Sequence, residues 1–128
     1  MEPRNTPFNF IFDYLLPLDI AVKPLFGMFY IYTGQRIILV LRDRKEQPEM
    51  NGIWVATNKG RQESLKKELP VLRAFSGPKS RDAGNGWQMI PKDAPDFESA
   101  AIRVCELIVH RDPRIGKIPV PRRKNSKK

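Results

Sequence analysis

The stretch that decides the fold class is LFGMFYIYTGQRIILVLRD, residues 25–43. Aromatic and β-branched residues, which favour strands, fill residues 25–32 and again residues 36–41. Thr33 and Gly34 lie between these two runs, and a glycine in such a turn lets the chain reverse at positive φ. The stretch therefore predicts two antiparallel strands joined by a tight turn. Both faces of the first strand are apolar, so the sheet is either covered on both sides or part of an interface.

Weaker patterns on both sides extend this prediction to an α+β fold. We expect a helix near residues 6–16, because Thr6 and Pro7 suit a helix start and apolar residues follow at helical spacing. Further strands are predicted at residues 52–57 and 87–91, and further helices near residues 59–69 and 94–111. Residues 17–24 are either extended or a short turn, and residues 71–75 fit neither pattern clearly. The sum is a small antiparallel sheet of about four strands with helices packed on it.

Length and charge distribution predict one domain with a basic appendage. The chain has 128 residues, of which 41% are hydrophobic, as in a single globular domain. Its net charge is +9, yet residues 111–128 hold eight basic side chains against one acidic, and the other residues hold 15 against 13. We therefore expect a single α+β domain over residues 1–116 and a flexible basic tail over residues 117–128.

The cysteine count and the N-terminal segment bear on the compartment. Cys105 is the only cysteine, so no internal disulfide can form, which fits a reducing compartment. The apolar N-terminal stretch is interrupted by Asp13, Pro17, Asp19 and Lys23 before it reaches the length of a secretory signal or a membrane span. We expect a cytoplasmic protein that does not contact the membrane.

No sequence motif of catalysis or metal binding is recognisable. Cys105 and His110 fall on different faces of one predicted helix, and no second histidine or CxxC pair accompanies them. Zinc needs about four converging ligands. No GxSxG elbow presents a serine, and FSGPKSRDAGNG, residues 75–86, lacks the GK[ST] ending of a phosphate loop. We predict that the protein is not an enzyme and needs neither a metal nor another cofactor.

Basic side chains predict low-specificity binding of nucleic acid, DNA above all. One basic cluster follows the second predicted strand and another surrounds the long loop at residues 76–86, so the two could straddle a phosphate backbone. Acidic neighbours dilute both clusters, and the alternative is a merely solvated surface. The tail is the better candidate. The candidate nucleic-acid-binding residues are Arg42, Arg44, Lys45, Arg73, Lys79, Arg81, Arg122, Arg123, Lys124, Lys127 and Lys128.

Four alternating aromatic residues predict a second kind of surface: Phe8, Phe10, Phe12 and Tyr14. They cannot all face inward on one helix, so this segment is either partly extended or exposes some rings to a partner. The alternative function is therefore a protein–protein interaction or homodimerisation module. Trp54 and Trp87 lie in predicted strands, and we expect both in the core because a buried indole removes a large apolar area from water.

Several stretches together resemble the MmcQ/YjbR-like double-wing family and the related TfoX N-terminal domain. They are KPLFGMFYIYTGQRIILVLRD at 23–43, WVAT at 54–57, LKKELPVLRAF at 65–75, GWQMIP at 86–91 and DFESAAIRVCELIVHRD at 96–112. The resemblance covers roughly residues 20–112 and implies a compact α+β fold, two wing-like hairpin projections and a DNA-binding role. Gly86 departs from the family, whose members often carry a basic residue or histidine there. The N-terminal aromatic segment and the basic tail lie outside the resemblance.

Overall fold

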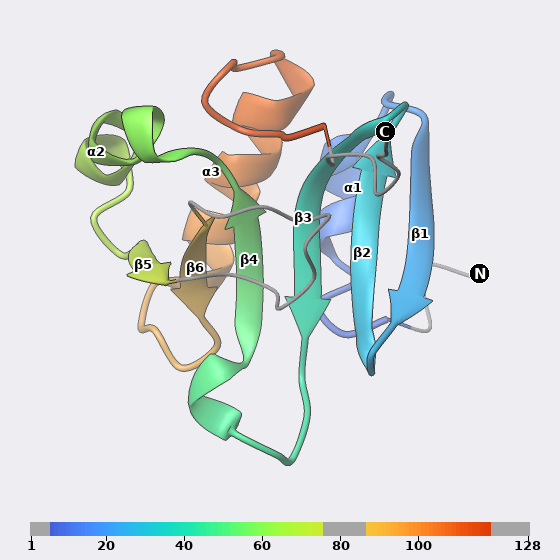
Figure 1. The fold of residues 1–128 in the computed structure, drawn as a ribbon, viewed down its shortest axis with the longest axis vertical. Helices are drawn as coiled ribbons and strands as arrows, with labels where there is room; N and C mark the ends of the chain where they lie inside the picture. Colours follow the sequence, from blue (N-terminus) through green and yellow to red (C-terminus); the bar gives the residue numbers. More distant parts are fainter. Residues whose placement is uncertain (1–5, 76–86, 119–128) are drawn as a thin grey trace, which may run out of the picture.

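One antiparallel sheet organises the chain, with its six strands in the order β1-β2-β3-β4-β6-β5 (Figure 1). The computed structural model describes residues 6–75 and 87–118. The strands are β1 (Ile20–Leu25), β2 (Met28–Thr33), β3 (Arg36–Arg42), β4 (Gly52–Ala56), β5 (Arg73–Phe75) and β6 (Trp87–Pro91). The helices are α1 (Ile11–Leu15), α2 (Lys59–Glu68) and α3 (Phe97–Val109), with a 3-10 turn η2 (Pro48–Met50). The predicted α+β class is confirmed.

The four predicted strands correspond to β2, β3, β4 and β6, but the first of them begins later than expected. Phe26 and Gly27 have φ angles of 56° and 75°, and Leu25 lies opposite Met28. Positive φ at both central positions is typical of a two-residue hairpin turn. Residues 25–27 therefore close a preceding hairpin, whose other strand is β1, so most of the stretch 17–24 is extended. The unassigned stretch 71–75 contributes the short edge strand β5.

The N-terminal helix is much shorter than the predicted residues 6–16. Phe8 has a φ of 56°, which an α-helix cannot accommodate, so Thr6 and Pro7 do not start the helix. The helix α1 begins only at Ile11 and ends at Leu15. The C-terminal helix agrees better with expectation, since α3 occupies the middle of the predicted range.

The main core lies between the sheet and the helices α1 and α3, which are seen behind it in Figure 1. The sheet contributes alternate residues of its central strands, such as Leu39, Ile53 and Ile90, and α3 contributes Val104 and Cys105. All five are at most 1% exposed. Burial of each such aliphatic side chain stabilises the fold by about 1.5–3 kcal/mol.

A second apolar cluster occupies the opposite face of the sheet. It consists of Met28, Tyr30, Ile37, Val40, Trp54, Ala56, Trp87 and Met89. Except at Ile38 and Leu39, where a register irregularity between β2 and β3 puts two adjacent residues in the main core, these residues alternate along the strands with those of the main core. The sheet is therefore apolar on both faces, as its sequence predicts. Trp54 is 4% exposed and Trp87 is fully buried, as expected for core residues.

After α3 the chain returns to the sheet. The backbones of Ile37 and Lys117 exchange hydrogen bonds of 2.8 and 2.9 Å, and the Gly116 amide donates to the Ala56 carbonyl at 2.7 Å. Backbone pairing thus continues through Lys117, one residue beyond the domain end expected at residue 116. Residues 119–128 of the predicted tail lie outside the described part of the chain. The returning segment forms one wall of the pocket described next.

Candidate anion-binding pocket

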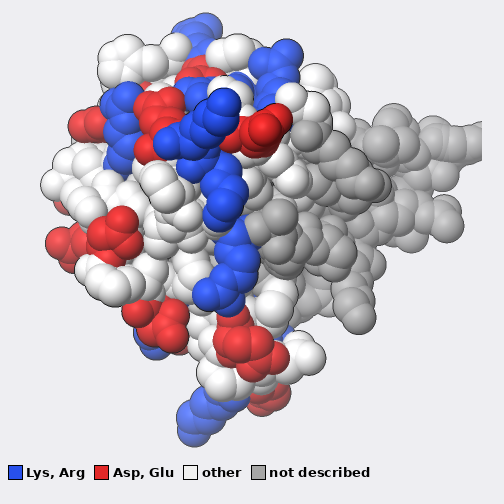
Figure 2. Space-filling model, turned by 90° about the vertical axis from the view of Figure 1, so that its left-hand side faces the viewer, with Lys and Arg blue, Asp and Glu red and all other residues white. Residues whose placement is uncertain are grey.

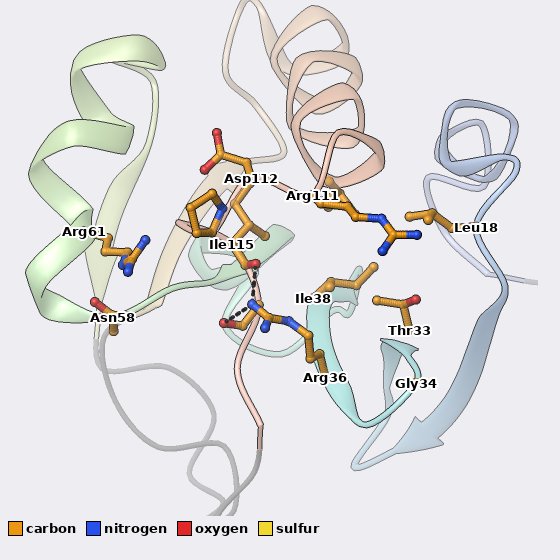
Figure 3. Close-up of a pocket in the computed structure, with 13 residues that line it drawn as sticks. Leu18, Thr33, Gly34, Arg36, Ile38, Asn58, Arg61, Arg111, Asp112 and Ile115 are labelled. Atoms are coloured by element: carbon orange, nitrogen blue, oxygen red, sulfur yellow. Dashed lines mark hydrogen bonds between the residues drawn. The ribbon is translucent and has the colours of Figure 1, made fainter.

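A pocket of about 630 Å³ opens at the end of the sheet where β2 turns into β3 (Figure 3). Four segments that are distant in the sequence line it: Leu18 before β1, the β2–β3 turn with the start of β3, the first turn of α2, and the end of α3 with the chain that leaves it. Pockets of this volume commonly hold small ligands or parts of larger ones. The topology of the sheet therefore creates a ligand-sized space at one end of the molecule.

The inner part of the pocket is apolar. Ile38 of β3, Ile108 of α3 and Ile115 of the returning segment line it, and they are 2, 6 and 3% exposed. Leu18 adds a fourth aliphatic side chain from the opposite side. This surface suits an apolar or ring-shaped part of a ligand and offers it no charge.

Three arginines surround this apolar surface, each from a different segment (Figure 3). Arg36 stands at the start of β3, and its Nη2 donates to the carbonyl oxygens of Ile115 and Gly116 at 3.2 and 3.4 Å. A side chain at Gly116 would place its Cβ 2.8 Å from the Arg36 Nε, and the φ of 112° also favours glycine. Gly116 therefore leaves the room that Arg36 needs to reach the pocket.

Arg61 and Arg111 complete the cationic rim. Arg61 lies in the first turn of α2, and Arg111 follows the end of α3 with a φ of 61°. The Arg111 and Asp112 amides donate to the carbonyls of Ile108 and Leu107, so α3 ends in a Schellman motif. Within the described part of the chain, neither guanidinium has a hydrogen bond or a salt bridge. Both are exposed cations at the mouth of the pocket.

The single carboxylate of the pocket is already neutralised. Asp112 accepts hydrogen bonds from the Arg114 Nε and Nη2 at 2.9 and 2.7 Å, and Arg114 also pairs with Glu68 at 2.6 Å. The hydrogen bonds from Arg114 lower the pKa of Asp112, and the charge of Arg61 lowers it further. Because Arg114 does not line the pocket, the three rim arginines keep an uncompensated positive charge.

Lysine and arginine side chains also form a band on the face of the molecule that carries α2 and β5 (Figure 2). Among the side chains of these two elements whose exposure is described, the exposed basic ones are Arg61, Lys66, Lys67 and Arg73. The Lys66 ammonium donates to the Leu72 carbonyl and so holds the chain after α2. Arg61 lies on α2 and also lines the pocket. Acidic side chains lie beside the band (Figure 2).

Arg42, one of the predicted phosphate contacts, is buried. It is 4% exposed, and its guanidinium donates to the Gln47 carbonyl at 2.9 Å, the Asn51 Oδ1 at 2.8 Å and the Glu46 carbonyl at 2.8 Å. Loss of hydration lowers the pKa of Arg42. The side chain organises the loop between β3 and β4, and we correct its assignment as a phosphate contact.

The remaining nucleic-acid candidates divide into exposed residues and residues outside the described chain. Arg44, Lys45 and Arg73 are exposed. Arg44 donates to the Phe26 carbonyl at 3.2 Å, which places it beside the β1–β2 turn, at the end of the sheet opposite the pocket. Their binding role stays a prediction. The candidates outside the described residues are Lys79, Arg81, Arg122, Arg123, Lys124, Lys127 and Lys128.

The N-terminal aromatic residues mostly serve the fold. The Phe8 and Phe10 rings lie 5.0 and 6.5 Å from the Phe97 ring of α3, and Phe12 packs against the main core. Of the four residues expected to form a partner surface, only Tyr14 is well exposed, at 44%. The turns before α1 let three rings pack inward although their spacing does not fit a helix, so the predicted partner surface is reduced to Tyr14.

Three other features were checked among the described residues: a reactive thiol, a metal site and a membrane-spanning helix. Cys105 is buried, and burial raises the pKa of its thiol to about 12, so the reactive thiolate does not form near neutral pH. No group of three or more His, Cys, Asp or Glu side chains that could hold a metal ion occurs within residues 6–75 and 87–118. In the same ranges no helix is both long and apolar enough to cross a membrane.

Comparison with known proteins gives no match to a family model, to a curated protein or to a solved structure. The resemblance to the double-wing family therefore stays a prediction. Function has to be argued from the pocket and the basic surface themselves.

Proposed function

We propose that the protein is a non-enzymatic binding module for the phosphate groups of nucleic acid, DNA above all. The observation that carries this proposal is the ring of Arg36, Arg61 and Arg111 around one pocket whose only carboxylate is held by Arg114. Guanidinium groups bind phosphate oxygens through paired, charge-assisted hydrogen bonds. Uncompensated arginines at the mouth of a pocket are therefore suited to an anionic ligand.

The surroundings of the pocket support a chain of phosphates over a single isolated anion. Arg61 lines the pocket and lies on α2, and the elements α2 and β5 carry further exposed cations, Lys67 and Arg73, for a longer phosphate backbone. The sequence beyond residue 118 adds five more basic residues and no acidic one. Contacts of this kind hold the phosphate backbone and do not read bases, so we expect little sequence preference.

The same geometry supports binding without catalysis. The pocket's one acidic side chain is Asp112, and its carboxylate is paired with Arg114, so it is poorly placed to accept a proton from a ligand.

Fluorescence anisotropy with labelled single-stranded and duplex DNA, at 50 to 200 mM salt, tests the proposal. We expect affinity to fall steeply with salt, because binding releases counterions from the phosphates. The double substitution Arg61→Gln and Arg111→Gln should reduce the slope of log K against log salt by about 2, one for each lost phosphate contact. Truncation after Ile118 should weaken binding further.

The matched control is Arg103→Gln. Arg103 is exposed on α3 but already paired with Glu68 at 2.6 Å and Glu106 at 3.3 Å, so its charge is largely compensated. The control should leave the salt slope close to that of the wild type. An absent or salt-insensitive interaction with both kinds of DNA rules the proposal out, as does an equal loss in the control and the double variant.

Self-association, the alternative expected from the sequence, finds little support in the described surface. The edge strand β1 contains Lys23 and Pro24, and both residue types discourage pairing between sheet edges. Phe26 and Leu16 are 66 and 67% exposed, but they lie at a hairpin tip and after α1, not on one continuous face. We therefore keep nucleic-acid binding as the single proposal.

A further inference from the structure

Arg111 occupies a position that most proteins give to glycine. It is the residue after the C-cap of α3, and its φ of 61° lies in the left-handed region. Side chains are disfavoured there because Cβ approaches the following carbonyl, which is why glycine predominates at this position of a Schellman motif. Its backbone amide closes the helix by donating to the Ile108 carbonyl, but within the described chain its guanidinium has no hydrogen bond or salt bridge that would favour arginine here.

The direction of Arg111 gives a reason for this strain. The left-handed residue turns the chain out of α3, and its guanidinium extends over the pocket between Leu18 and Ile38 (Figure 3). Backbone strain of this kind is found at binding sites, where it fixes a functional side chain in place. Arg111 is therefore positioned for a ligand.

The positive charge of the pocket favours a phosphomonoester over a phosphodiester. Three guanidinium groups line the pocket from different sides (Figure 3), and the nearby carboxylate is neutralised from outside by Arg114. A phosphodiester within a nucleic-acid strand carries one negative charge, whereas a terminal phosphomonoester carries between one and two near neutral pH and has three oxygens that can accept hydrogen bonds. A pocket lined by three arginines, with its carboxylate already paired, has an excess of positive charge that matches the monoester better.

The apolar inner surface indicates what the phosphate is attached to. Ile38, Ile108 and Ile115 together present a surface without hydrogen-bonding groups, beneath the arginine rim. Inorganic phosphate would leave this surface in contact with water, whereas a ring-sized group would cover it. The volume of about 630 Å³ accommodates both parts of such a ligand.

We infer that the pocket is a binding site for a phosphomonoester attached to a ring-sized group, as in a nucleoside monophosphate or the phosphorylated end of a nucleic-acid strand. The strand-end form rests on the proposed function, but the free nucleotide form does not. Arg111 binds the phosphate, Arg61 and Arg36 add positive charge from the other sides of the pocket, and the isoleucines contact the base or sugar.

Isothermal titration calorimetry with adenosine 5′-monophosphate, adenosine and inorganic phosphate tests the site in the full chain. We expect saturable 1:1 binding of the monophosphate, at least tenfold weaker binding of inorganic phosphate and no measurable binding of adenosine. Arg111→Gly should weaken monophosphate binding by about tenfold or more, the usual effect of losing one charge-assisted contact. Arg61→Gln should weaken it by a smaller factor, because the pocket loses one positive charge. Arg103→Gln should change it by less than twofold.

Arg111→Gly keeps this test free of folding artefacts, because glycine suits the backbone of that position better than arginine does. Its thermal midpoint should equal or exceed that of the wild type while the affinity falls. No monophosphate binding, or binding that Arg111→Gly and Arg61→Gln leave unchanged, overturns the inference. Equal affinity for inorganic phosphate and the monophosphate overturns the role of the apolar surface.

Single strands with a 5′-phosphate or a 5′-hydroxyl separate the two sources of the ligand. Tighter binding of the phosphorylated strand, lost in Arg111→Gly, supports the strand-end form. Equal binding of the two strands, with the free monophosphate still bound, supports the nucleotide form. Failure of both strands to bind while the monophosphate binds overturns the proposed function and leaves the pocket assignment standing.

Discussion

Substitution of Arg111 by glycine is expected to make the protein more stable and less able to bind its ligand. A left-handed conformation costs a residue with a side chain about 1–2 kcal/mol. Glycine removes this cost, but its greater freedom in the unfolded chain offsets about 0.5–1 kcal/mol of the gain. Since the Arg111 side chain has no hydrogen bond or salt bridge in the described chain, and glycine keeps the backbone bond to the Ile108 carbonyl, little else is lost. The expected net effect is a stabilisation of about 0.5–1 kcal/mol.

Urea denaturation of wild type, Arg111→Gly and Arg111→Ala measures this effect. Alanine removes the guanidinium but keeps the backbone strain, so it should unfold close to the wild type, with glycine the more stable of the two variants. Both variants should lose affinity for adenosine 5′-monophosphate to the same degree. If glycine is no more stable than alanine, the strain at this position is absent. If either variant binds like the wild type, Arg111 does not contact the ligand.

Three further predictions concern stability. Arg42→Ala should lower the free energy of unfolding by about 2–3 kcal/mol, because three hydrogen bonds from a buried guanidinium are lost. If urea denaturation shows a loss below about 0.5 kcal/mol, Arg42 does not hold this loop. Gly52→Ala should lower the free energy of unfolding by about 3 kcal/mol or prevent folding, since the alanine Cβ would lie 2.1 Å from the Ile90 carbonyl oxygen. A variant with the soluble yield and thermal midpoint of the wild type would contradict this clash. The pKa of Asp112 is lower in the folded protein than in the unfolded chain, where an aspartate has a pKa of about 4. The pair of Asp112 with Arg114 therefore stabilises the fold above about pH 4, and this stability is lost as the pH falls through the pKa that Asp112 has in the folded protein. Arg114→Gln should therefore unfold less steeply than the wild type between pH 5 and 2 in circular dichroism, and parallel acid transitions would contradict this.

The central strands were predictable because local pattern and tertiary environment agree there. Arg36–Arg42 and Gly52–Ala56 combine branched residues with nearby turn residues, and both become buried strands of the sheet centre. The apolar character of both faces also followed from the sequence. The two tryptophans were placed correctly because few sites other than a core can bury an indole.

The predicted boundaries of helices and strands were wrong where residues other than glycine have a positive φ. Phe26 and Phe8 have φ angles of 56°, although the aromatic runs around them favour a continuous strand and a continuous helix. Tertiary packing decides both positions: Phe8 stacks near Phe97, and Phe26 closes the β1–β2 hairpin. Residue propensities do not predict positions at which tertiary contacts outweigh the local preference for a strand or a helix.

The sequence did not predict that the three pocket arginines lie near one pocket, because only the folded topology brings their segments together. Arg36, Arg61 and Arg111 follow a hairpin turn, a helix start and a helix end, and each looks like ordinary surface charge in its own segment. One local signal existed, since Arg111 stands directly after a helix where glycine is usual. Arg42 was misassigned for the opposite reason: a charged residue at a strand end is usually exposed, but here a loop folds over it.

Two-dimensional NMR of the ¹⁵N-labelled protein during titration with adenosine 5′-monophosphate tests the central claim most directly. Gly34 and Gly116 line the pocket, whereas Gly27 lies in the β1–β2 turn at the other end of the sheet. Saturable shifts of the Gly34 and Gly116 amides, without a shift at Gly27 and lost in Arg111→Gly, are the predicted result. Unmoved pocket glycines at saturating ligand, or shifts centred on Gly27, would contradict the assignment of the arginine pocket as the binding site.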